Sequence, residues 1–414
     1  MFRPLPGLTA VSRAHRLLLG VFALSGLISF SWLARIPSVR DALRLTAADL
    51  GGILLLGSVG ALLTVVSSAT LLARFGSARI FGTGAVVMST GFVLMGTGAG
   101  VGARWIFLVG VLLNGIGGAL LNVPMNVESA RIERAYGRTV IPHFHAAFSA
   151  GAVGGSVLGA LASAAEVPVL VQFAVVGVGV GTLRLIALAF GLVLPGGAHG
   201  GRSEDSGRAT AGLRAWSEPR TLLIGVVAFA AALSEGAANN WLSLAFVDAF
   251  AAPEAAGGLV LGVFIGSMTL VRVLGTSVID RLGRVATLQL SGVTAFLGLA
   301  SFGLAGSPPF AIFGVALWGV GAALCFPIAV AAASDLPEAA AGRVSVVASM
   351  SSIAVLTAAP MIGYLASFLG ETQHALLAVL LVLVAGLAVS GRVAPPADDT
   401  PPVGADALSP ARAT

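Results

Sequence analysis

The chain has 414 residues, of which 57% are hydrophobic and only 10% charged, more apolar surface than a water-soluble protein can bury. All 23 of its basic residues are arginine and none forms a dense cluster, so the net charge of +5 gives no indication of a nucleic-acid partner. The single cysteine excludes an internal disulfide and a cysteine-based metal cage. We therefore predict an all-α membrane protein.

A membrane span needs about 20 mainly apolar residues, and the chain contains twelve such stretches. We place them at residues 16–37, 47–73, 79–99, 104–129, 139–164, 168–194, 220–249, 255–279, 285–306, 309–333, 343–369 and 371–391. The first follows three arginines, as in a signal peptide, but it ends without a small-x-small cleavage site. We expect it to remain part of the mature protein.

The polar stretch at 195–219, rich in glycine and serine, has the composition of a linker and separates six spans from six. We predict an N-terminal six-helix bundle (1–195), a cytoplasmic linker (196–219), a C-terminal six-helix bundle (220–393) and a disordered cytoplasmic tail (394–414).

The arginines indicate the orientation. With the N-terminus inside, most of them fall in cytoplasmic segments, and the outer side keeps only Arg35, Arg40, Arg44 and Arg104. We therefore expect both termini to be cytoplasmic in a protein of the cytoplasmic membrane. Arg35 would then be a residue that snorkels at the outer end of the first span.

The two halves resemble each other at a nearly constant offset. The triplet Gly51-Gly52-Ile53 returns as Gly257-Gly258-Leu259, and Arg74-Phe75-Gly76 returns as Arg281-Leu282-Gly283. Such an offset predicts two six-helix pseudo-repeats of parallel topology, related by an axis along the membrane normal.

Several segments resemble the major facilitator superfamily. The run Asp280-Arg281-Leu282-Gly283-Arg284 is similar to the cytoplasmic signature of that superfamily. The segments 122–128 and 142–149, with Glu235-Gly236-Ala237, are similar to its YbjJ-like branch, which is related to fucose permeases. The resemblance implies the twelve-helix major facilitator fold, in which the seventh span lines a central cavity. In fucose-type permeases an acid stands on the fourth span, but the matching position here is Leu120, so that proton site does not carry over.

Glu235 is the predicted proton-coupling residue. At about 1.5 Å per residue, it lies just beyond the middle of the seventh span, where an ionisable side chain indicates function. A carboxylate at this depth can take up and release a proton as water access changes. The alternative is a neutral glutamate that hydrogen-bonds a neighbouring helix.

Amides and small polar residues recur at helical spacing on three spans and point inward, because lipid would not accept them. They are either a surface for a polar solute or contacts that join helices. Few acidic or aromatic residues accompany them, which favours a neutral solute over a bulky cation. The predicted cavity residues are Ser29, Trp32, Asn114, Asn122, Asn126, Asn239, Asn240 and Trp241.

Charged residues at the cytoplasmic ends of spans form a predicted inner gate. Arg272 belongs to this group because, one third of the way along its span, it can snorkel or reach the signature loop. Arg184 lies in the middle of the sixth span, and the sequence names no partner for it. The predicted gating residues are Glu128, Arg131, Arg272, Asp280, Arg281, Gly283 and Arg284.

Together these features predict a monomeric secondary transporter that moves a small polar solute by alternating access, coupled to protons. No phosphate loop, nucleophile elbow or zinc pattern occurs, so we expect neither a cofactor nor a bound metal and no enzymatic activity. The alternatives are a drug or metabolite efflux antiporter of the same fold and a membrane sensor or scaffold that transports nothing.

Overall fold

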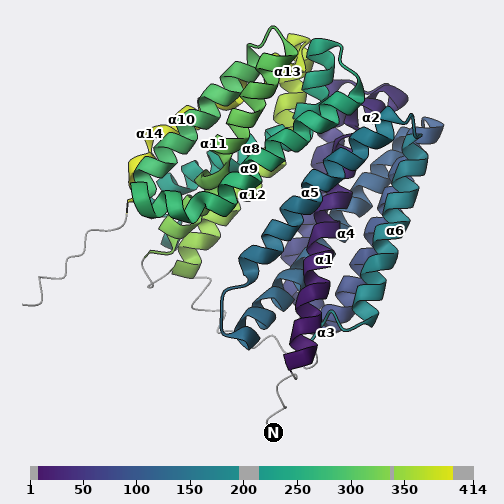
Figure 1. Cartoon of the computed structure of the whole chain (residues 1–414), viewed down its shortest axis with the longest axis vertical. Helices are drawn as coiled ribbons and strands as arrows, with labels where there is room; N and C mark the ends of the chain where they lie inside the picture. Colours follow the sequence, from purple (N-terminus) through teal and green to yellow (C-terminus); the bar gives the residue numbers. More distant parts are fainter. Residues whose placement is uncertain (1–7, 195–213, 336–339, 395–414) are drawn as a thin grey trace, which may run out of the picture.

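A computed structural model describes residues 8–194, 214–335 and 340–394, and these are helical with no strand. They form two bundles that stand side by side (Figure 1). Most of the predicted linker and nearly all of the predicted tail lie outside the described residues. The first bundle consists of α1 (Leu8–Leu33), α2 (Ile36–Leu43), α3 (Ala47–Val101), α4 (Arg104–Tyr136), α5 (Ile141–Ala164) and α6 (Val169–Ala189).

The second bundle repeats this arrangement without a counterpart of α2. It consists of α8 (Pro219–Phe250), α9 (Glu254–Leu282), α10 (Arg284–Gly303), α11 (Pro308–Ala333), α12 (Ala340–Leu369), α13 (Thr372–Ala375), α14 (Ala378–Ala388) and the 3-10 turn η1 (Ser390–Val393).

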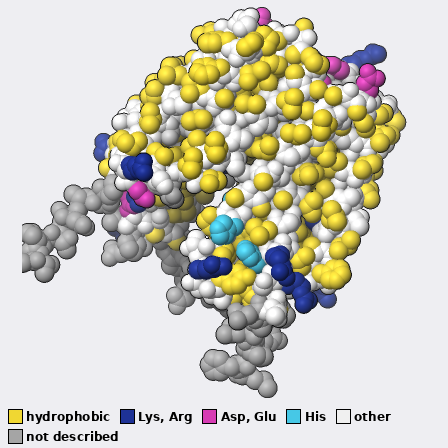
Figure 2. Space-filling model, in the orientation of Figure 1, with side chains coloured by type: hydrophobic (Ala, Val, Ile, Leu, Met, Phe, Trp, Pro, Cys, Tyr) yellow, Lys and Arg dark blue, Asp and Glu magenta, His cyan; other side chains and the backbone are white. Residues whose placement is uncertain are grey.

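Eleven helical stretches of the described chain are long and apolar enough to cross a membrane, and Thr372–Ala388 is a shorter apolar stretch. The shorter one is the predicted twelfth span, interrupted between α13 and α14 and continued by η1. The predicted fold of twelve helices is therefore confirmed. Large apolar side chains cover much of the surface (Figure 2), as contact with lipid requires.

Two glycines mark the predicted internal repeat in the backbone. Gly76 has φ 77° and ψ 160° where the second and third spans meet within α3, and Gly283 has φ 76° and ψ 165° between α9 and α10. Only glycine adopts this region without strain. The same turn therefore joins the second span to the third in each bundle.

The short helix α2 was not predicted. Pro37 stands in its first turn, where proline favours helix initiation, and Arg44 ends it in a left-handed conformation. Because of this helix, α1 ends at Leu33, before the predicted residue 37. The first helix begins at Leu8 and α4 continues to Tyr136, so both are longer than predicted.

The bundles touch mainly along two helix pairs, α5 with α9 and α3 with α12, and α8 makes smaller contacts with α1 and α2. They meet where α2 and α13 lie, which we call the closed end (Figure 1). At the opposite end, where α1 and α8 begin, they form separate lobes in the space-filling view (Figure 2). We call this the open end.

Candidate functional site

Two ionisable residues meet inside the second bundle. Oε2 of Glu235 on α8 lies 2.9 Å from Nη2 of Arg272 on α9. Nε of Arg272 donates a hydrogen bond to the carbonyl of Ala323 on α11 at 3.2 Å. The two side chains are 29% and 31% exposed, so the pair is open on one side. Arg272 thus reaches Glu235 within the membrane part of the bundle and not the signature loop.

His145 of the first bundle lies near this ion pair. It is on α5, the helix that packs against α9, and it interacts electrostatically with Arg272. Its ring also contacts Phe22 on α1, with 5.8 Å between the ring centroids. A titratable group of the first bundle is therefore within electrostatic range of the Glu235–Arg272 pair.

The residues that follow Glu235 on α8 differ in their surroundings. The Oδ1 atom of Asn239 is buried and has no hydrogen-bond partner among the described residues, while Nδ2 of Asn240 donates to the carbonyl of Gly236 at 2.8 Å. Trp241 is fully buried against Gly363 of α12. The structure thus places Trp241 in the packed core and leaves Asn239 as the amide with unused hydrogen-bonding capacity.

The three predicted cavity asparagines on α4, Asn114, Asn122 and Asn126, also differ in whether their amides have hydrogen-bond partners. Asn122 and Asn126 are exposed, and Nδ2 of Asn126 donates to both the carbonyl and Oδ1 of Asn122, each at 2.9 Å. Oδ1 of Asn114 is buried without a partner among the described residues. On α1, Trp32 is buried in the core, whereas Ser29 lines a cavity together with Asn122.

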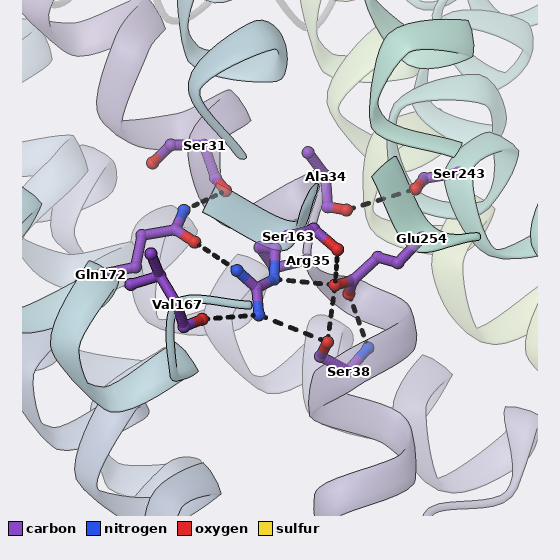
Figure 3. Close-up of polar contacts among 9 residues, drawn as sticks. All are labelled: Ser31, Ala34, Arg35, Ser38, Ser163, Val167, Gln172, Ser243 and Glu254. Carbon is purple, nitrogen blue, oxygen red and sulfur yellow. Dashed lines mark hydrogen bonds and ion pairs between the residues drawn. The ribbon is translucent and has the colours of Figure 1, made fainter. Parts of the chain in front are cut away.

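The closed end is held by an ion pair between the bundles (Figure 3). Arg35, which directly follows α1, is only 4% exposed. Its Nε lies 2.9 Å from Oε2 of Glu254, an ionic contact without hydrogen-bond geometry, and its Nη atoms donate to Gln172 at 2.8 Å and to the carbonyl of Val167 at 3.1 Å. The prediction that Arg35 snorkels is therefore wrong.

Glu254, the first residue of α9, was not singled out in the sequence. Its carboxylate accepts hydrogen bonds from the backbone N–H of Ser38 at 2.7 Å, from the Ser38 hydroxyl at 2.6 Å and from the Ser163 hydroxyl at 2.7 Å. One acid of the second bundle therefore binds α2 and α5 of the first (Figure 3).

Further polar contacts cross between the bundles at the same end. Nη1 of Arg40 lies 2.5 Å from Oδ2 of Asp248, and the backbone N–H of Ala48 donates to the Ser367 hydroxyl at 2.9 Å. The Ser243 hydroxyl on α8 also donates to the carbonyl of Ala34 at 3.4 Å, so all of these contacts join the bundles at the closed end.

At the open end, ion pairs form within each bundle. Arg131 binds Glu128 at 2.9 Å and donates to the carbonyl of Leu194 at 2.9 Å. In the second bundle, Arg284 and Arg220 both pair with Asp335.

The family follows from comparison with known proteins. The sequence profile of the Major Facilitator Superfamily matches residues 17–352. The chain belongs to this superfamily. It is 28% identical to the uncharacterized transporter y4wD of Sinorhizobium fredii over 79% of this chain and 84% of that protein. It is 25% identical to membrane protein MosC of Rhizobium meliloti over 89% of this chain and 86% of that protein.

Solved structures of the superfamily share the fold at low sequence identity. The nucleoside transporter NupG aligns with a TM-score of 0.72 at 15% identity, covering 92% of this chain and 98% of its own. The fucose transporter FucP, in its outward conformation, aligns with a TM-score of 0.59 at 15% identity, covering 93% and 99%. These likenesses establish the twelve-helix fold.

The superfamily signature occupies the open end. Asp280 and Arg281 are exposed, Gly283 makes the turn between α9 and α10, and Arg284 pairs with Asp335, which the sequence did not indicate. The predicted gating residues therefore lie in two groups, Glu128 and Arg131 in the first bundle and the remaining ones in the second. Among the described residues, no group of three or more His, Cys, Asp or Glu is placed to hold a metal.

Proposed function

We propose that this membrane transporter of the Major Facilitator Superfamily moves a small polar solute across the cytoplasmic membrane by alternating access, with protonation of Glu235 coupled to the movement. The Glu235–Arg272 pair carries this proposal, because it is an ion pair that both lies within the helices and is open on one side.

The distribution of charge supports an orientation. Arg131, Arg220, Arg284 and Arg343 are at the open end, and cytoplasmic segments hold the excess of basic residues. On this basis the open end and both termini face the cytoplasm, the closed end faces outside, and the structure represents an inward-open state.

Arg272 gives Glu235 a mechanism for coupling. While the carboxylate is ionised, the guanidinium neutralises it, so the pair can remain within the membrane part of the protein. A proton on Glu235 removes that attraction and frees Arg272, which also interacts with His145 of the other bundle. Proton binding thus changes the electrostatic interaction between α9 and α5, one helix from each bundle. Among structural neighbours, FucP is described as a fucose:proton symporter.

Transport by the purified protein in proteoliposomes tests the proposal. The first solutes are L-fucose and uridine, followed by polyols and sugar acids, with the outside made acidic to drive uptake. Glu235→Gln should abolish accumulation driven by the pH gradient and leave counterflow exchange largely intact, since glutamine keeps the shape of the side chain but cannot take up or release a proton. Glu371→Gln, at an exposed acid of the closed end, is the matched control.

Two results would contradict the proposal. If Glu235→Gln shows the parent's pH dependence, Glu235 has no part in coupling. If no member of the solute panel shows saturable flux with folded protein, the proposed class of solute is wrong. Accumulation driven only by the opposite gradient would instead identify the efflux antiporter.

A further inference from the structure

Arg184 on α6 is a buried cation without an acid. Its side chain is 0% exposed. Nη2 donates to the Ser25 hydroxyl at 2.9 Å, Nη1 contacts the Met88 sulfur at 3.2 Å, and Nε has no hydrogen-bond partner. In the part of the chain that the structure describes, no carboxylate pairs with it. Its contacts are therefore one hydroxyl and one thioether, and a thioether is a weak acceptor.

This environment is unusual for a structural arginine. A buried charge is stable when it is paired and its hydrogen bonds are satisfied. Arg35, almost as buried, is paired with the carboxylate of Glu254, and both of its Nη atoms donate hydrogen bonds. Arg184 has no such pairing among the described residues, so the structure alone does not explain why a cation is held at this depth, where an ionisable side chain indicates function.

Arg184 also lines a cavity of about 140 Å³ within the first bundle. Polar groups in its wall come from Ser25, Ser29 and Asn122, and the remaining wall includes Phe22 and Phe148. The volume accommodates several water molecules or a small acid group. The cavity thus combines one cation, hydroxyl and amide donors, and no acid among its lining residues.

We propose that this cavity binds the carboxylate of a small organic acid and that Arg184 is its counter-charge. A guanidinium presents paired N–H groups that match the two oxygens of a carboxylate. The carboxylate would replace the sulfur of Met88 and take up the unused Nε. Methionine is flexible enough to yield this place. Transport of this acid rests on the function proposed above. An acid as the solute replaces the neutral solute that the sequence led us to expect.

Thermal unfolding of the full chain in detergent tests binding without transport. The probes are three acids, each with a neutral counterpart: D-glucuronate with D-glucose, D-gluconate with sorbitol, and lactate with propane-1,2-diol. A ligand that binds the folded form raises the midpoint temperature, and the rise increases with the ratio of its concentration to its Kd. We expect at least one acid to raise it and its neutral counterpart to have no effect.

Variants connect this shift to the cavity. Arg184→Gln should abolish the shift. Arg184→Lys keeps the charge but loses the paired donors, so the apparent affinity for the acid should fall about tenfold and the shift should become smaller. Arg134→Gln removes an exposed arginine of α4 and should leave the shift unchanged. If Arg184→Gln cannot be purified, Ser25→Ala tests the cavity with Arg184 in place and should weaken acid binding.

The unliganded protein gives a second readout. Because Arg184→Gln removes an uncompensated buried charge, it should raise the midpoint temperature without ligand, whereas loss of a structural arginine would lower it. A lowered midpoint, an equal shift in parent and Arg184→Gln, or no shift with any acid would each overturn the proposal.

Failure of this inference and of the proposed function look different. If acid binding depends on Arg184 but Glu235→Gln leaves the pH dependence of transport unchanged, the binding site is supported and the coupling role of Glu235 is refuted. If neutral solutes are transported in a Glu235-dependent way and no acid raises the midpoint temperature, the coupling role of Glu235 is supported and the acid-binding site is refuted.

Discussion

Loss of the Glu254 carboxylate should open the closed end. This one side chain binds Arg35 and accepts three hydrogen bonds from Ser38 and Ser163, all across the boundary between the bundles. Removing one partner of a buried ion pair costs about 3–5 kcal/mol. Glutamine retains one oxygen that can still accept from a serine, so we expect the lower value for Glu254→Gln, about 3 kcal/mol.

The loss of about 3 kcal/mol destabilises only the arrangement in which the closed end is shut. When the bundles separate at this end, water reaches both Arg35 and Glu254, and the substitution has no comparable cost. Since 1.4 kcal/mol changes an equilibrium tenfold, the population with this end closed, relative to the population with it open, should fall on the order of 100-fold. A transporter that rests with this end closed would then populate both arrangements.

Spin labels on two exposed alanines measure the opening. Ala165 follows α5 in the first bundle and Ala249 lies on α8 in the second, both at the closed end. The buried Cys325 is the single native cysteine, so labelling at introduced cysteines is specific. The distance distribution should gain a longer component in Glu254→Gln and not in Glu371→Gln. Identical distributions in folded parent and Glu254→Gln would refute the role of this ion pair.

Two further predictions concern stability. A Cβ on Gly151 would lie 1.9 Å from the carbonyl oxygen of Ala23, whereas one on Gly154 would meet nothing within 4 Å. Gly151→Ala should therefore lower the unfolding temperature by pushing α1 from α5, at about 1–3 kcal/mol, and Gly154→Ala should not. At the open end, the hydrogen bond from Arg343 holds the pKa of Glu218 below its ordinary value, so this pair stabilises the fold at neutral pH. The stabilisation should begin to be lost as the pH falls below about 4.3, the ordinary pKa of a glutamate, and should be gone once the pH lies below the lower pKa of the folded state. The difference in unfolding temperature from Glu218→Gln should therefore shrink as the pH falls, and a difference that grows instead would contradict this sign.

The sequence was sufficient for the spans because lipid requires long apolar helices that satisfy their own backbone. It was also sufficient for the repeat, since Gly76 and Gly283 occupy the same backbone conformation in both bundles. The short helix α2 escaped prediction because its eight residues are amphipathic, with little net hydrophobicity, and lie between two spans.

Pairings between helices could not be predicted, because they depend on which faces meet. Glu235 and Arg272 were each chosen for their depth, but depth did not reveal that they bind each other. Arg35 and Glu254 lie far apart in the chain, and the available signal was that both stand at ends of spans that the sequence predicts to face the same side. The depth of Arg184 was likewise apparent, whereas its place in a cavity depends on how α6 packs against α1 and α3.

The two proposed sites are related through charge. With Glu235 ionised and His145 neutral, the Glu235–Arg272 pair contributes no net charge and Arg184 contributes one positive charge. A carboxylate at Arg184 reduces this to zero, and a proton on Glu235 restores it. The fully loaded protein then carries the same net charge in these sites as the empty one, so neither crossing moves a different charge through the membrane field. We therefore expect joint movement of one proton with one carboxylate to be electroneutral, and transport in proteoliposomes should then not respond to the membrane potential.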